Sequence, residues 1–362
     1  MKSVALVHDY LIQMGGAERV LASLHDIFPD APVYTSVLRK TNLSSEFLKM
    51  DIRTSFLQNW PFMEREFRVY FMLYPLAFSS FDLSQFDVIV SSSSAYAKGI
   101  KKRKGQVHVC YCHTPMRFAW RFDDYIARQN LNPLLAKGIS LFIPWLKKWD
   151  LDTVKNVDYF IANSSFIAER IRSIYKRDSV IIYPPVDLEL FKPSTIDKDY
   201  FLIISRLSAY KRIDLAIAAF SKLGLPLKIV GIGPDLKRLK NLAGKSVEFL
   251  GHLPDEKIKQ LYAECRALIF PGEEDFGITP LEAAASGRPT IAYGAGGAKE
   301  TVIDGKTGIL FKEQTEESLS SAIERFQSMK FDKEVLVGHA KKFGAEVFKE
   351  RFKRFLNENK IL

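Results

Sequence analysis

Two glutamates stand eight residues apart in a segment whose pattern places both of them where a ligand can reach them. Glu274 follows an apolar run that predicts a strand, and Glu282 falls inside a helix that begins near Thr279 and Pro280. A loop carboxylate and a helical carboxylate can accept hydrogen bonds from two different sets of hydroxyl groups, and free amides near Gly277 favour an anion. The pair fits either the hydroxyl-rich part of a nucleotide sugar or the acid and nucleophile of a glycosidase.

Two basic residues occur at a comparable place earlier in the chain. Arg206 and Lys211 lie just beyond a predicted strand end and before a predicted helix. Cations at such a place can hold a diphosphate that gains charge as it leaves, although solvated surface charges would give the same pattern. Gly231 and Gly233 form a small-residue turn after the next strand, suited to a flat ring lying against backbone. Beside these groups, the paired glutamates suit a nucleotide sugar better than a bare glycoside.

The amino-terminal half contributes a second set of candidates. Gly15 and Gly16 open a helix after the first predicted strand, where backbone amides can meet phosphate, but ordinary turns also use this pair. The G-x-G-x-x-G pattern of nicotinamide dinucleotide sites is missing. His113 follows a strand that carries Cys110 and Cys112, and it is a candidate for catalysis or a buried core histidine. A metal site is disfavoured because a fourth ligand at suitable spacing is missing, so we interpret the cysteines as buried thiols.

Short apolar, β-branched runs with helical patterns between them predict the elements that position these residues. Such runs are typical of parallel sheets buried on both faces. They form two series, each sufficient for one doubly wound α/β domain that binds ligands at the carboxyl ends of its strands. The first series is Val4–Val7, Val88–Val90, Val107–Tyr111, Tyr159–Ala162 and Val180–Tyr183, and the second is Phe201–Ile204, Leu227–Val230, Val247–Leu250, Ala267–Phe270 and Pro289–Ala292.

A proline-containing stretch separates the two series. Tyr183–Pro193 holds two adjacent prolines that exclude a continuous helix, and polar residues follow it, which predicts a linker. We therefore expect domains over residues 1–190 and 191–342. Residues 343–362 are predicted to form a carboxy-terminal helix that packs back on the amino-terminal domain. Its apolar stripe would consist of Phe343, Phe348, Phe352 and Phe355.

Composition restricts the classes of partner. The chain has 362 residues, of which 47% are hydrophobic, and its formal net charge is +10, which favours anionic ligands. The only tight basic run is Lys101–Lys104, so a nucleic-acid partner is not expected. The first apolar run is too short for a signal peptide, and no stretch reaches the roughly eighteen apolar residues of a membrane-spanning helix. We expect a cytoplasmic protein, and a two-lobed solute-binding protein, which would carry an export signal, is disfavoured.

Taken together, the motifs resemble those of the retaining family-four glycosyltransferases with the GT-B fold over nearly the whole chain. The bacterial O-antigen and exopolysaccharide mannosyltransferases are the most similar members. The resemblance implies an α/β fold with two Rossmann-like domains facing each other across a cleft, the first binding the acceptor and the second the nucleotide sugar. The residues that carry it are Gly15–Glu18, Tyr111–Arg117, Ser205–Leu207 with Lys211, and Glu274 and Glu282 followed by Ala283–Pro289.

The resemblance also implies roles for individual residues. Glu282 would bind the ribose, Glu274 would hold hydroxyls of the donor sugar, and Gly16 would belong to the loop that closes over the diphosphate. His113 would lie beside the donor sugar and the reacting centre. Asp275 departs from the family, which often has glycine there. The implied catalytic set is His113, Glu274, Arg206 and Lys211, and the implied donor-binding set is Gly15, Gly16, Arg206, Lys211, Gly231, Gly233, Leu253, Glu274, Phe276, Gly277, Ile278, Thr279 and Glu282.

The expected reaction is transfer of a hexose, most simply mannose from GDP-mannose, to a lipid-linked or polysaccharide acceptor in surface glycan biosynthesis. Without an obvious nucleophile, retention suggests front-face attack, and cations on the diphosphate would make a metal or other cofactor unnecessary. Alternatives are a UDP-sugar-dependent transferase of glucosyl, galactosyl or N-acetylhexosaminyl groups, a nucleotide-sugar hydrolase or epimerase, and a sugar-nucleotide-binding subunit without catalysis. Aromatic and basic residues in Trp60–Tyr74 and Leu134–Trp149 suit either contact with the inner membrane leaflet or ordinary core with a solvated face.

Overall fold

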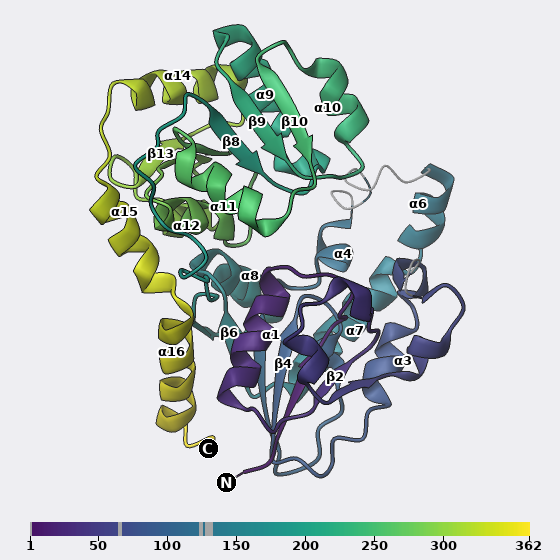
Figure 1. Cartoon of the computed structure of the whole chain (residues 1–362). Helices are drawn as coiled ribbons and strands as arrows, with labels where there is room; N and C mark the ends of the chain where they lie inside the picture. Colours follow the sequence, from purple (N-terminus) through teal and green to yellow (C-terminus); the bar gives the residue numbers. More distant parts are fainter. Residues whose placement is uncertain (1, 64–66, 123–125, 127–132) are drawn as a thin grey trace. The chain divides into compact units, whose positions relative to one another are not determined.

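The computed structural model describes residues 2–63, 67–122, 126 and 133–362, and it divides the chain into two compact units. The N-terminal unit comprises the described residues of 1–125 and 132–185, together with the carboxy-terminal segment Glu346–Leu362. The C-terminal unit contains Val186–Ala345. Each unit is built on one parallel sheet (Figure 1).

Within the described residues, the N-terminal unit holds a seven-stranded sheet in the order β3-β2-β1-β4-β5-β6-β7, with every neighbouring pair parallel. The order runs outward in both directions from the first strand, which is the pattern of a doubly wound sheet. Its strands are β1 (Val4–His8), β2 (Val33–Thr35), β3 (Ile52–Thr54), β4 (Val88–Ser93), β5 (Val107–Cys112), β6 (Tyr159–Ala162) and β7 (Ser179–Ile181). Its described α-helices are α1 (Gly16–Ile27), α3 (Tyr74–Ser79), α4 (Arg117–Trp120), α6 (Pro133–Ser140), α7 (Ile143–Thr153), α8 (Ser165–Tyr175) and α16 (Ala345–Glu358).

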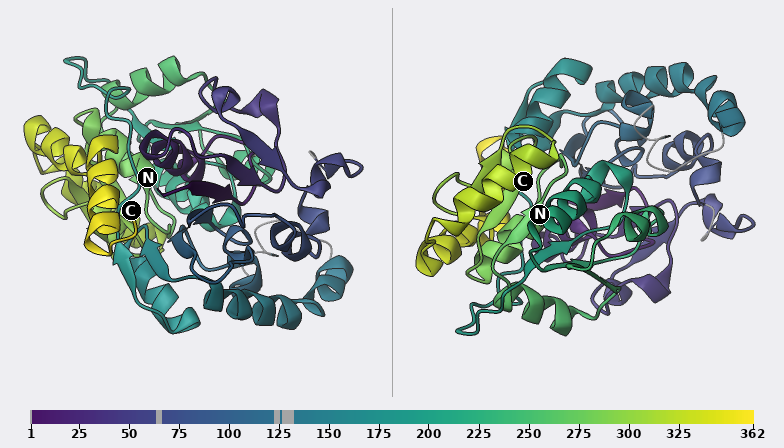
Figure 2. Two further views of the ribbon diagram at one scale, coloured as in Figure 1. Left: turned by 90° about the horizontal axis from the view of Figure 1, so that it is seen from below. Right: turned by 90° about the horizontal axis from the view of Figure 1, so that it is seen from above.

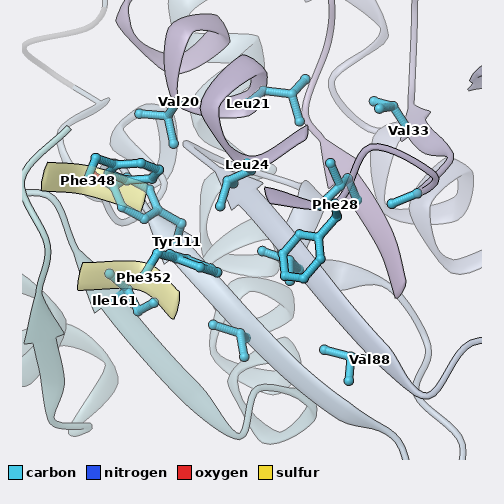
Figure 3. Close-up of a cluster of buried hydrophobic side chains, with 14 of the residues drawn as sticks. Val20, Leu21, Leu24, Phe28, Val33, Val88, Tyr111, Ile161, Phe348 and Phe352 are labelled. Atoms are coloured by element: carbon cyan, nitrogen blue, oxygen red, sulfur yellow. The ribbon is translucent and has the colours of Figure 1, made fainter. Parts of the chain in front are cut away.

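Both faces of this sheet are buried, because successive residues of a strand point to opposite sides. Leu6 of β1 joins a cluster with α1 and α16, whereas its neighbours Ala5 and Val7 join a second cluster with α3 and α7. Figure 3 shows the first cluster, in which Phe348 and Phe352 of α16 lie beside side chains of α1 and of the strands. The apolar runs of β1, β4, β5 and β6 are therefore core strands, as predicted. The run at Val180 instead belongs to the edge strand β7, and Val180 is 46% exposed.

The last helix makes its apolar contacts within the N-terminal unit. Phe348 packs edge-to-face against Tyr111 of β5, with ring centroids 5.8 Å apart. The two chain termini lie side by side in Figure 2, and Nζ of Lys2 donates to the carbonyl oxygen of Ile361 at 2.9 Å. Phe343 does not share this stripe, which corrects the expectation from its spacing. It lies in a separate 3-10 turn (Lys341–Phe343) and contacts Phe276 in the C-terminal unit.

The C-terminal unit contains, among the residues described, a six-stranded parallel sheet in the order β10-β9-β8-β11-β12-β13. Phe201 and Ile203 of β8 face a cluster with α9 and α14, and Leu202 faces one with α11, α12 and α15. The strands are β8 (Phe201–Ile204), β9 (Leu227–Val230), β10 (Val247–Gly251), β11 (Leu268–Phe270), β12 (Thr290–Tyr293) and β13 (Gly308–Phe311). The described α-helices are α9 (Ile213–Leu223), α10 (Leu236–Leu242), α11 (Asp255–Glu264), α12 (Ile278–Ala285), α13 (Ala298–Thr301), α14 (Glu316–Gln327) and α15 (Lys333–Ala340).

The predicted strands all occur, with ends shifted by at most three residues, and the predicted class of two parallel-sheet α/β domains is confirmed. Sequence reasoning missed β2, β3 and β13, which are short or lie at sheet edges. The domain limits after residues 190 and 342 stay predictions. The compact units change over at Pro185/Val186 and at Ala345/Glu346.

Candidate active site

The predicted cation Lys211 and the predicted carboxylate Glu274 meet at one edge of the C-terminal sheet. Lys211 ends a 3-10 turn after β8, and Glu274 lies in the loop after β11, which is the neighbouring strand. Their side chains form an ion pair, and they are only 19% and 16% exposed. Because parallel strands end at the same edge of a sheet, the topology accounts for the meeting of two residues that lie 63 positions apart in the sequence.

Close backbone packing fixes the loop that carries Glu274. A Cβ atom on Gly272 would lie 2.9 Å from the Cα of Lys211, so a larger residue would push the two loops apart. On the other side, the amide of Gly297 donates to the carbonyl oxygen of Glu274 at 2.9 Å. A Cβ on Gly296 would lie 2.3 Å from that same oxygen. Glycines on both sides therefore hold the carboxylate loop in place.

Glu282 is held by a hydrogen bond that the sequence does not reveal. It lies in α12, it is 6% exposed, and its Oε2 accepts a hydrogen bond from the hydroxyl of Tyr262 at 2.8 Å. Tyr262 belongs to α11 and is fully buried. A tyrosine twenty residues before a glutamate carries no recognisable spacing signal, so Tyr262 escaped prediction. Burial of a carboxylate requires such a partner, and Tyr262 supplies one.

The start of α12 suits an anion. Gly277 occupies the N-cap position with φ +98°, in the left-handed region that favours glycine, and it has no side chain with which to cap the helix. The first turn contains no acidic residue. The amides at Ile278 and Thr279 thus begin a helix whose positive end carries neither a capping side chain on its N-cap residue nor an acidic residue in its first turn. The observed start at Ile278 lies within one residue of the start predicted near Thr279.

Arg206 lies in the loop after β8, and its side chain is exposed. It makes no ion pair with any residue that the structure describes. Gly231 and Gly233 pack against this loop. A Cβ on Gly231 would lie 1.9 Å from the carbonyl oxygen of Ser205, and one on Gly233 would lie 2.1 Å from that of Leu207. The two glycines therefore allow the loops after β8 and β9 to touch and so set the position of Arg206.

Leu253 and Phe276, two further predicted donor-binding residues, do not line the pocket that contains Lys211 and Glu274. Leu253 lines a surface pocket of about 290 Å³ together with Tyr200 and Lys228. A separate, smaller pocket is lined by Lys211 and Glu274 and does not include Leu253. The side chain of Phe276 is 4% exposed and packs against Phe343, with ring centroids 5.9 Å apart. Phe276 can therefore serve a ligand through its backbone, whereas its ring belongs to the core.

The remaining predicted residues belong to the N-terminal unit. Gly15 is the N-cap residue of α1, with an extended backbone (φ −153°) and no side chain of its own to cap the helix. Gly16 is the first helical residue. A Cβ on Gly15 would lie 3.0 Å from Oε2 of Glu18, so the glycine allows the carboxylate to fold back beneath its own loop. The predicted contact of this loop with phosphate stays a prediction.

His113 directly follows β5 and is 9% exposed. Its ring Nε2 lies 2.8 Å from Oγ of Ser92, and its carbonyl oxygen accepts a hydrogen bond from the side-chain amide of Asn163 at 3.1 Å. Burial, and secondarily the nearby His8, lowers the pKa of His113 from 6.5 to about 3. The ring is therefore a neutral imidazole at physiological pH, with Nε2 tied to the protein interior.

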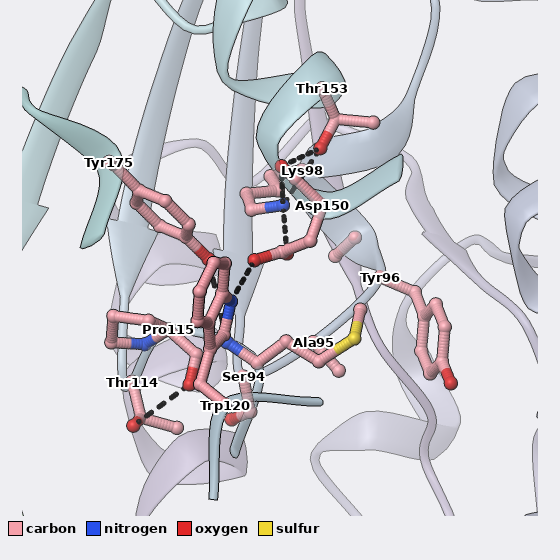
Figure 4. A network of polar contacts seen from close by, with 12 residues as sticks. Ser94, Ala95, Tyr96, Lys98, Thr114, Pro115, Trp120, Asp150, Thr153 and Tyr175 are labelled. Atoms are coloured by element: carbon pink, nitrogen blue, oxygen red, sulfur yellow. Dashed lines mark hydrogen bonds and ion pairs between the residues drawn. The ribbon is translucent and has the colours of Figure 1, made fainter. Parts of the chain in front are cut away.

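A buried ion pair positions the segment that follows His113 (Figure 4). Lys98, which is 1% exposed, pairs with Asp150, which is fully buried in α7. The other carboxylate oxygen of Asp150 accepts a hydrogen bond from Nε1 of Trp120 at 2.7 Å, and the hydroxyl of Thr153 lies 2.8 Å from Nζ of Lys98. The side chain of Trp120, seven residues after His113, is thus tied to α7. Lys98 and Asp150 are 52 residues apart, and sequence reasoning did not find this pair.

None of the helices in the described ranges is both long enough and apolar enough to cross a bilayer. Exposed apolar side chains do gather on the N-terminal unit, in the two segments expected to contact a membrane. Phe71 of the first segment and Phe142 of the second lie in contact, with centroids 6.4 Å apart. The strongly exposed members are Trp60 (42%), Phe62 (76%), Val69 (68%), Leu134 (81%), Leu135 (54%), Leu141 (76%), Phe142 (46%) and Trp145 (44%).

Two family descriptions match the chain. Residues 14–190 match "Glycosyltransferase Family 4", and residues 187–344 match "Glycosyl transferases group 1". Together the two matches cover most of the sequence.

Individual relatives are distant. The "Uncharacterized glycosyltransferase MJ1178" of Methanocaldococcus jannaschii is 27% identical over 173 residues, which is 46% of this chain and 49% of that protein. This chain therefore matches about half the length of that relative. The "Alpha-1,3/1,6-mannosyltransferase ALG2" of Homo sapiens is 27% identical over 320 residues, covering 76% of this chain and 74% of the relative. Among solved structures, Anabaena Alr3699/HepE in complex with UDP and glucose superposes with a TM-score of 0.70 at 19% identity, covering 99% and 100% of the two chains. That likeness shows the fold.

Proposed function

Because the chain belongs to the family-four glycosyltransferases, we propose that it transfers a hexose from a nucleotide sugar with retention of the anomeric configuration. The contact between Lys211 and Glu274 beside the start of α12, where glycine is the N-cap residue, supports this proposal more than any other observation. It brings together a cation for the diphosphate, a carboxylate for sugar hydroxyls and helix amides for an anion. Glu282, oriented by Tyr262, would accept hydrogen bonds from the ribose hydroxyls.

The donor that we propose is GDP-mannose. The mannosyltransferase ALG2 is among the relatives that match three quarters of this chain, and the resemblance to surface-polysaccharide mannosyltransferases points the same way. A UDP-sugar is the alternative donor. The two donors must be distinguished by direct measurement. Loop shape and backbone contacts, rather than the paired glutamates, determine which nucleotide base binds.

The reaction that fits these residues is a front-face displacement. The acceptor oxygen forms a bond to the anomeric carbon while the bond from that carbon to the diphosphate oxygen breaks. The acceptor proton passes to the departing diphosphate. Arg206 and Lys211 stabilise the negative charge that develops on this leaving group, and Glu274 positions the sugar without forming a covalent bond. We propose that these two cations provide the charge stabilisation that a metal ion would otherwise supply, and that His113 acts at the reacting sugar.

The acceptor that we propose is a lipid-linked glycan, reached from the cytoplasmic face of a membrane. The exposed apolar residues described within Trp60–Tyr74 and Leu134–Trp149 form the contact surface, hereafter the apolar face, with Lys137 and Lys148 available for anionic headgroups. Aromatic and aliphatic side chains beside lysines are typical of an interfacial contact. The apolar contact between Phe71 and Phe142 shows that the two segments touch each other.

Vesicle flotation tests the apolar face. We expect the protein to float with vesicles containing anionic phosphatidylglycerol and to lose this binding when Leu134 and Leu141 are both replaced by serine. Leu242→Ser is the matched control, because Leu242 is similarly exposed (52%) on the C-terminal unit. Absence of binding to anionic vesicles, or an equal loss in the control, would contradict a membrane role for this surface.

Donor binding and transfer are tested separately. Thermal-shift measurements with GDP, UDP and ADP sugars identify the donor, because a ligand that binds only the native state raises its stability. Product analysis of the identified donor, with and without a lipid-linked acceptor, then separates transfer from hydrolysis and epimerisation. Stabilisation by none of the nucleotide sugars would refute the proposed function. Release of free hexose regardless of acceptor would indicate a hydrolase.

A further inference from the structure

Four polar side chains from distant parts of the sequence form a buried chain of contacts that ends at His113. They are His8 at the end of β1, Glu18 in α1, Ser92 in β4 and His113 after β5. All four are nearly inaccessible, with exposed fractions of 3%, 3%, 0% and 9%. A buried polar group is costly unless it is hydrogen-bonded, so such a chain imposes a definite arrangement of protons.

The contacts follow one another in a line. Oε1 of Glu18 lies 3.9 Å from Nε2 of His8, close enough for strong electrostatic influence but too long for a hydrogen bond. The other ring nitrogen of His8, Nδ1, lies 3.1 Å from Oγ of Ser92. The same oxygen lies 2.8 Å from Nε2 of His113. Ser92 therefore bridges the two imidazole rings.

A serine hydroxyl has one proton, and when that proton lies between the two rings the bridge has two arrangements. If the hydroxyl of Ser92 donates to Nδ1 of His8, its oxygen accepts from Nε2–H of His113. If it donates to Nε2 of His113 instead, the proton on His113 must sit on Nδ1 when that ring is neutral. The direction of the serine proton thus decides which nitrogen of His113 is protonated.

The carboxylate of Glu18 selects the first arrangement. Its negative charge faces Nε2 of His8 and favours a proton on that nitrogen, which in a neutral ring leaves Nδ1 of His8 as the acceptor for Ser92. We propose that Glu18, His8 and Ser92 are positioning residues that hold His113 as the Nε2–H tautomer and leave its Nδ1 as a hydrogen-bond acceptor for a hydroxyl group of the reacting sugars. The catalytic part of this inference rests on the proposed glycosyl transfer.

Two other observations agree with this assignment. Nδ1 of His113 has no hydrogen-bond partner among the described residues, so it is the nitrogen left for a ligand. Burial also keeps the pKa of His113 near 3, so that the ring has a lone pair to offer at neutral pH. Gly15 contributes as well, since a side chain there would displace the carboxylate of Glu18.

The same strand provides a matched control on the opposite face of the sheet. Oγ of Ser91 lies 2.7 Å from Nε2 of His108, and Nδ1 of His108 lies 3.0 Å from the carbonyl oxygen of Asn156. A carbonyl oxygen can only accept, so His108 must carry its proton on Nδ1. The two Ser–His pairs of β4 therefore predict opposite tautomers, and only the pair with His113 has a place in the proposed reaction.

Nitrogen-15 NMR of the ligand-free full-length protein, labelled at its six histidines, tests the tautomer without reference to activity. His113→Gln and His108→Gln assign the two signals. We expect a protonated Nε2 and an unprotonated Nδ1 for His113, and the reverse for His108. Glu18→Gln keeps the shape of the side chain but removes its charge, so His113 should become a mixture of tautomers while His108 is unchanged. An unprotonated Nε2 in His113 of the wild type, or no response to Glu18→Gln, would overturn the inference.

Steady-state kinetics then tests the catalytic consequence. We expect Ser92→Ala and Glu18→Gln to lower kcat by about tenfold to a hundredfold, part of the range for proton-handling groups, with a smaller effect on the KM of the donor. Ser91→Ala should leave kcat unchanged. Equal losses in Ser92→Ala and Ser91→Ala would assign both serines a purely structural role. Full activity of His113→Ala would overturn the catalytic part alone, since the NMR result stands independently of turnover.

Discussion

Replacing Lys211 with alanine separates transition-state stabilisation from stability of the fold. The backbone of Lys211 lies against Gly272, and this contact does not depend on the side chain. What the substitution removes is the ammonium group paired with Glu274. Loss of one preorganised charge at a developing anion costs about 3–4 kcal/mol of transition-state stabilisation, so we expect kcat to fall by roughly a hundredfold to a thousandfold.

The effect on stability should be much smaller. Exposed ion pairs contribute about 0–1 kcal/mol, and breaking a fully buried pair costs about 3–5 kcal/mol. The side chains of Lys211 and Glu274 are 19% and 16% exposed, so water can reach the carboxylate that remains. We therefore expect a free-energy loss of about 1–2 kcal/mol and a decrease in Tm of a few degrees. The variant should be folded at assay temperature.

The assay is the initial rate at saturating donor, together with the KM of the donor and the thermal midpoint. Lys222→Ala is the matched control, because Lys222 also forms an ion pair, with Glu316 at 2.8 Å, but lies at the other end of the helix that follows Lys211. The control should keep wild-type kcat. A Lys211→Ala variant with near-normal kcat would refute the charge-stabilising role. A raised KM with unchanged kcat would show that Lys211 contributes only to ground-state binding.

Three further predictions concern other contacts. Tyr262→Phe removes the hydrogen bond to buried Glu282 and should lower the free energy of unfolding by about 1.5–3 kcal/mol. It should also weaken nucleotide binding measured by calorimetry. An unchanged affinity would contradict the proposed binding of the ribose by Glu282. Phe352→Ala should lower the free energy of unfolding, measured in urea, by about 3–5 kcal/mol, because Phe352 lies in the core. Lys353→Ala, at an exposed position of the same helix, should change this free energy by less than about 0.5 kcal/mol. Equal effects of the two substitutions would exclude α16 from the core. Burial lowers the pKa of His108 to about 4, whereas the pKa in the unfolded chain is near 6.5. As the pH falls, the unfolded state therefore binds the extra proton at a higher pH than the folded state. Stability should therefore be complete above about pH 6.5 and fall by about 1.4 kcal/mol per pH unit for this ring down to about pH 4. His108→Gln should flatten the urea-measured pH dependence, and an unchanged slope would contradict the assignment.

The fold was predictable where apolar runs were long and continuous. Strands buried on both faces, such as Phe201–Ile204 and Tyr159–Ala162, appear with the same limits in sequence and structure. Strand β3 was missed because it has three residues at the sheet edge and no fully buried side chain, so its sequence has no apolar run. Phe343 was misplaced for a related reason. Helical spacing does not show that Gly344 ends a short turn and separates Phe343 from α16.

The candidate site was predictable to the extent that its residues follow strand ends directly. Lys211 and Glu274 come after strands β8 and β11, and parallel topology alone brings such positions together. The side chains that orient the site are a different case. Tyr262 and Ser92 matter because each lies within hydrogen-bond distance of a candidate site residue on another helix or strand. The order of residues in the sequence does not reveal such distances.

This distinction explains why the bridge from Glu18 to His113 has no sequence signature even though both residues stand in recognisable motifs. Glu18 follows Gly15 and Gly16, and its motif suggests a role for the glycine amides. The structure shows its carboxylate pointing instead towards His8, with Gly15 leaving room for it. If the tautomer of His113 responds to the charge of Glu18, the glycine-rich loop serves the reaction in two ways. Its backbone would meet the donor, and its buried carboxylate would set the proton on the histidine that we propose acts at the reacting sugar.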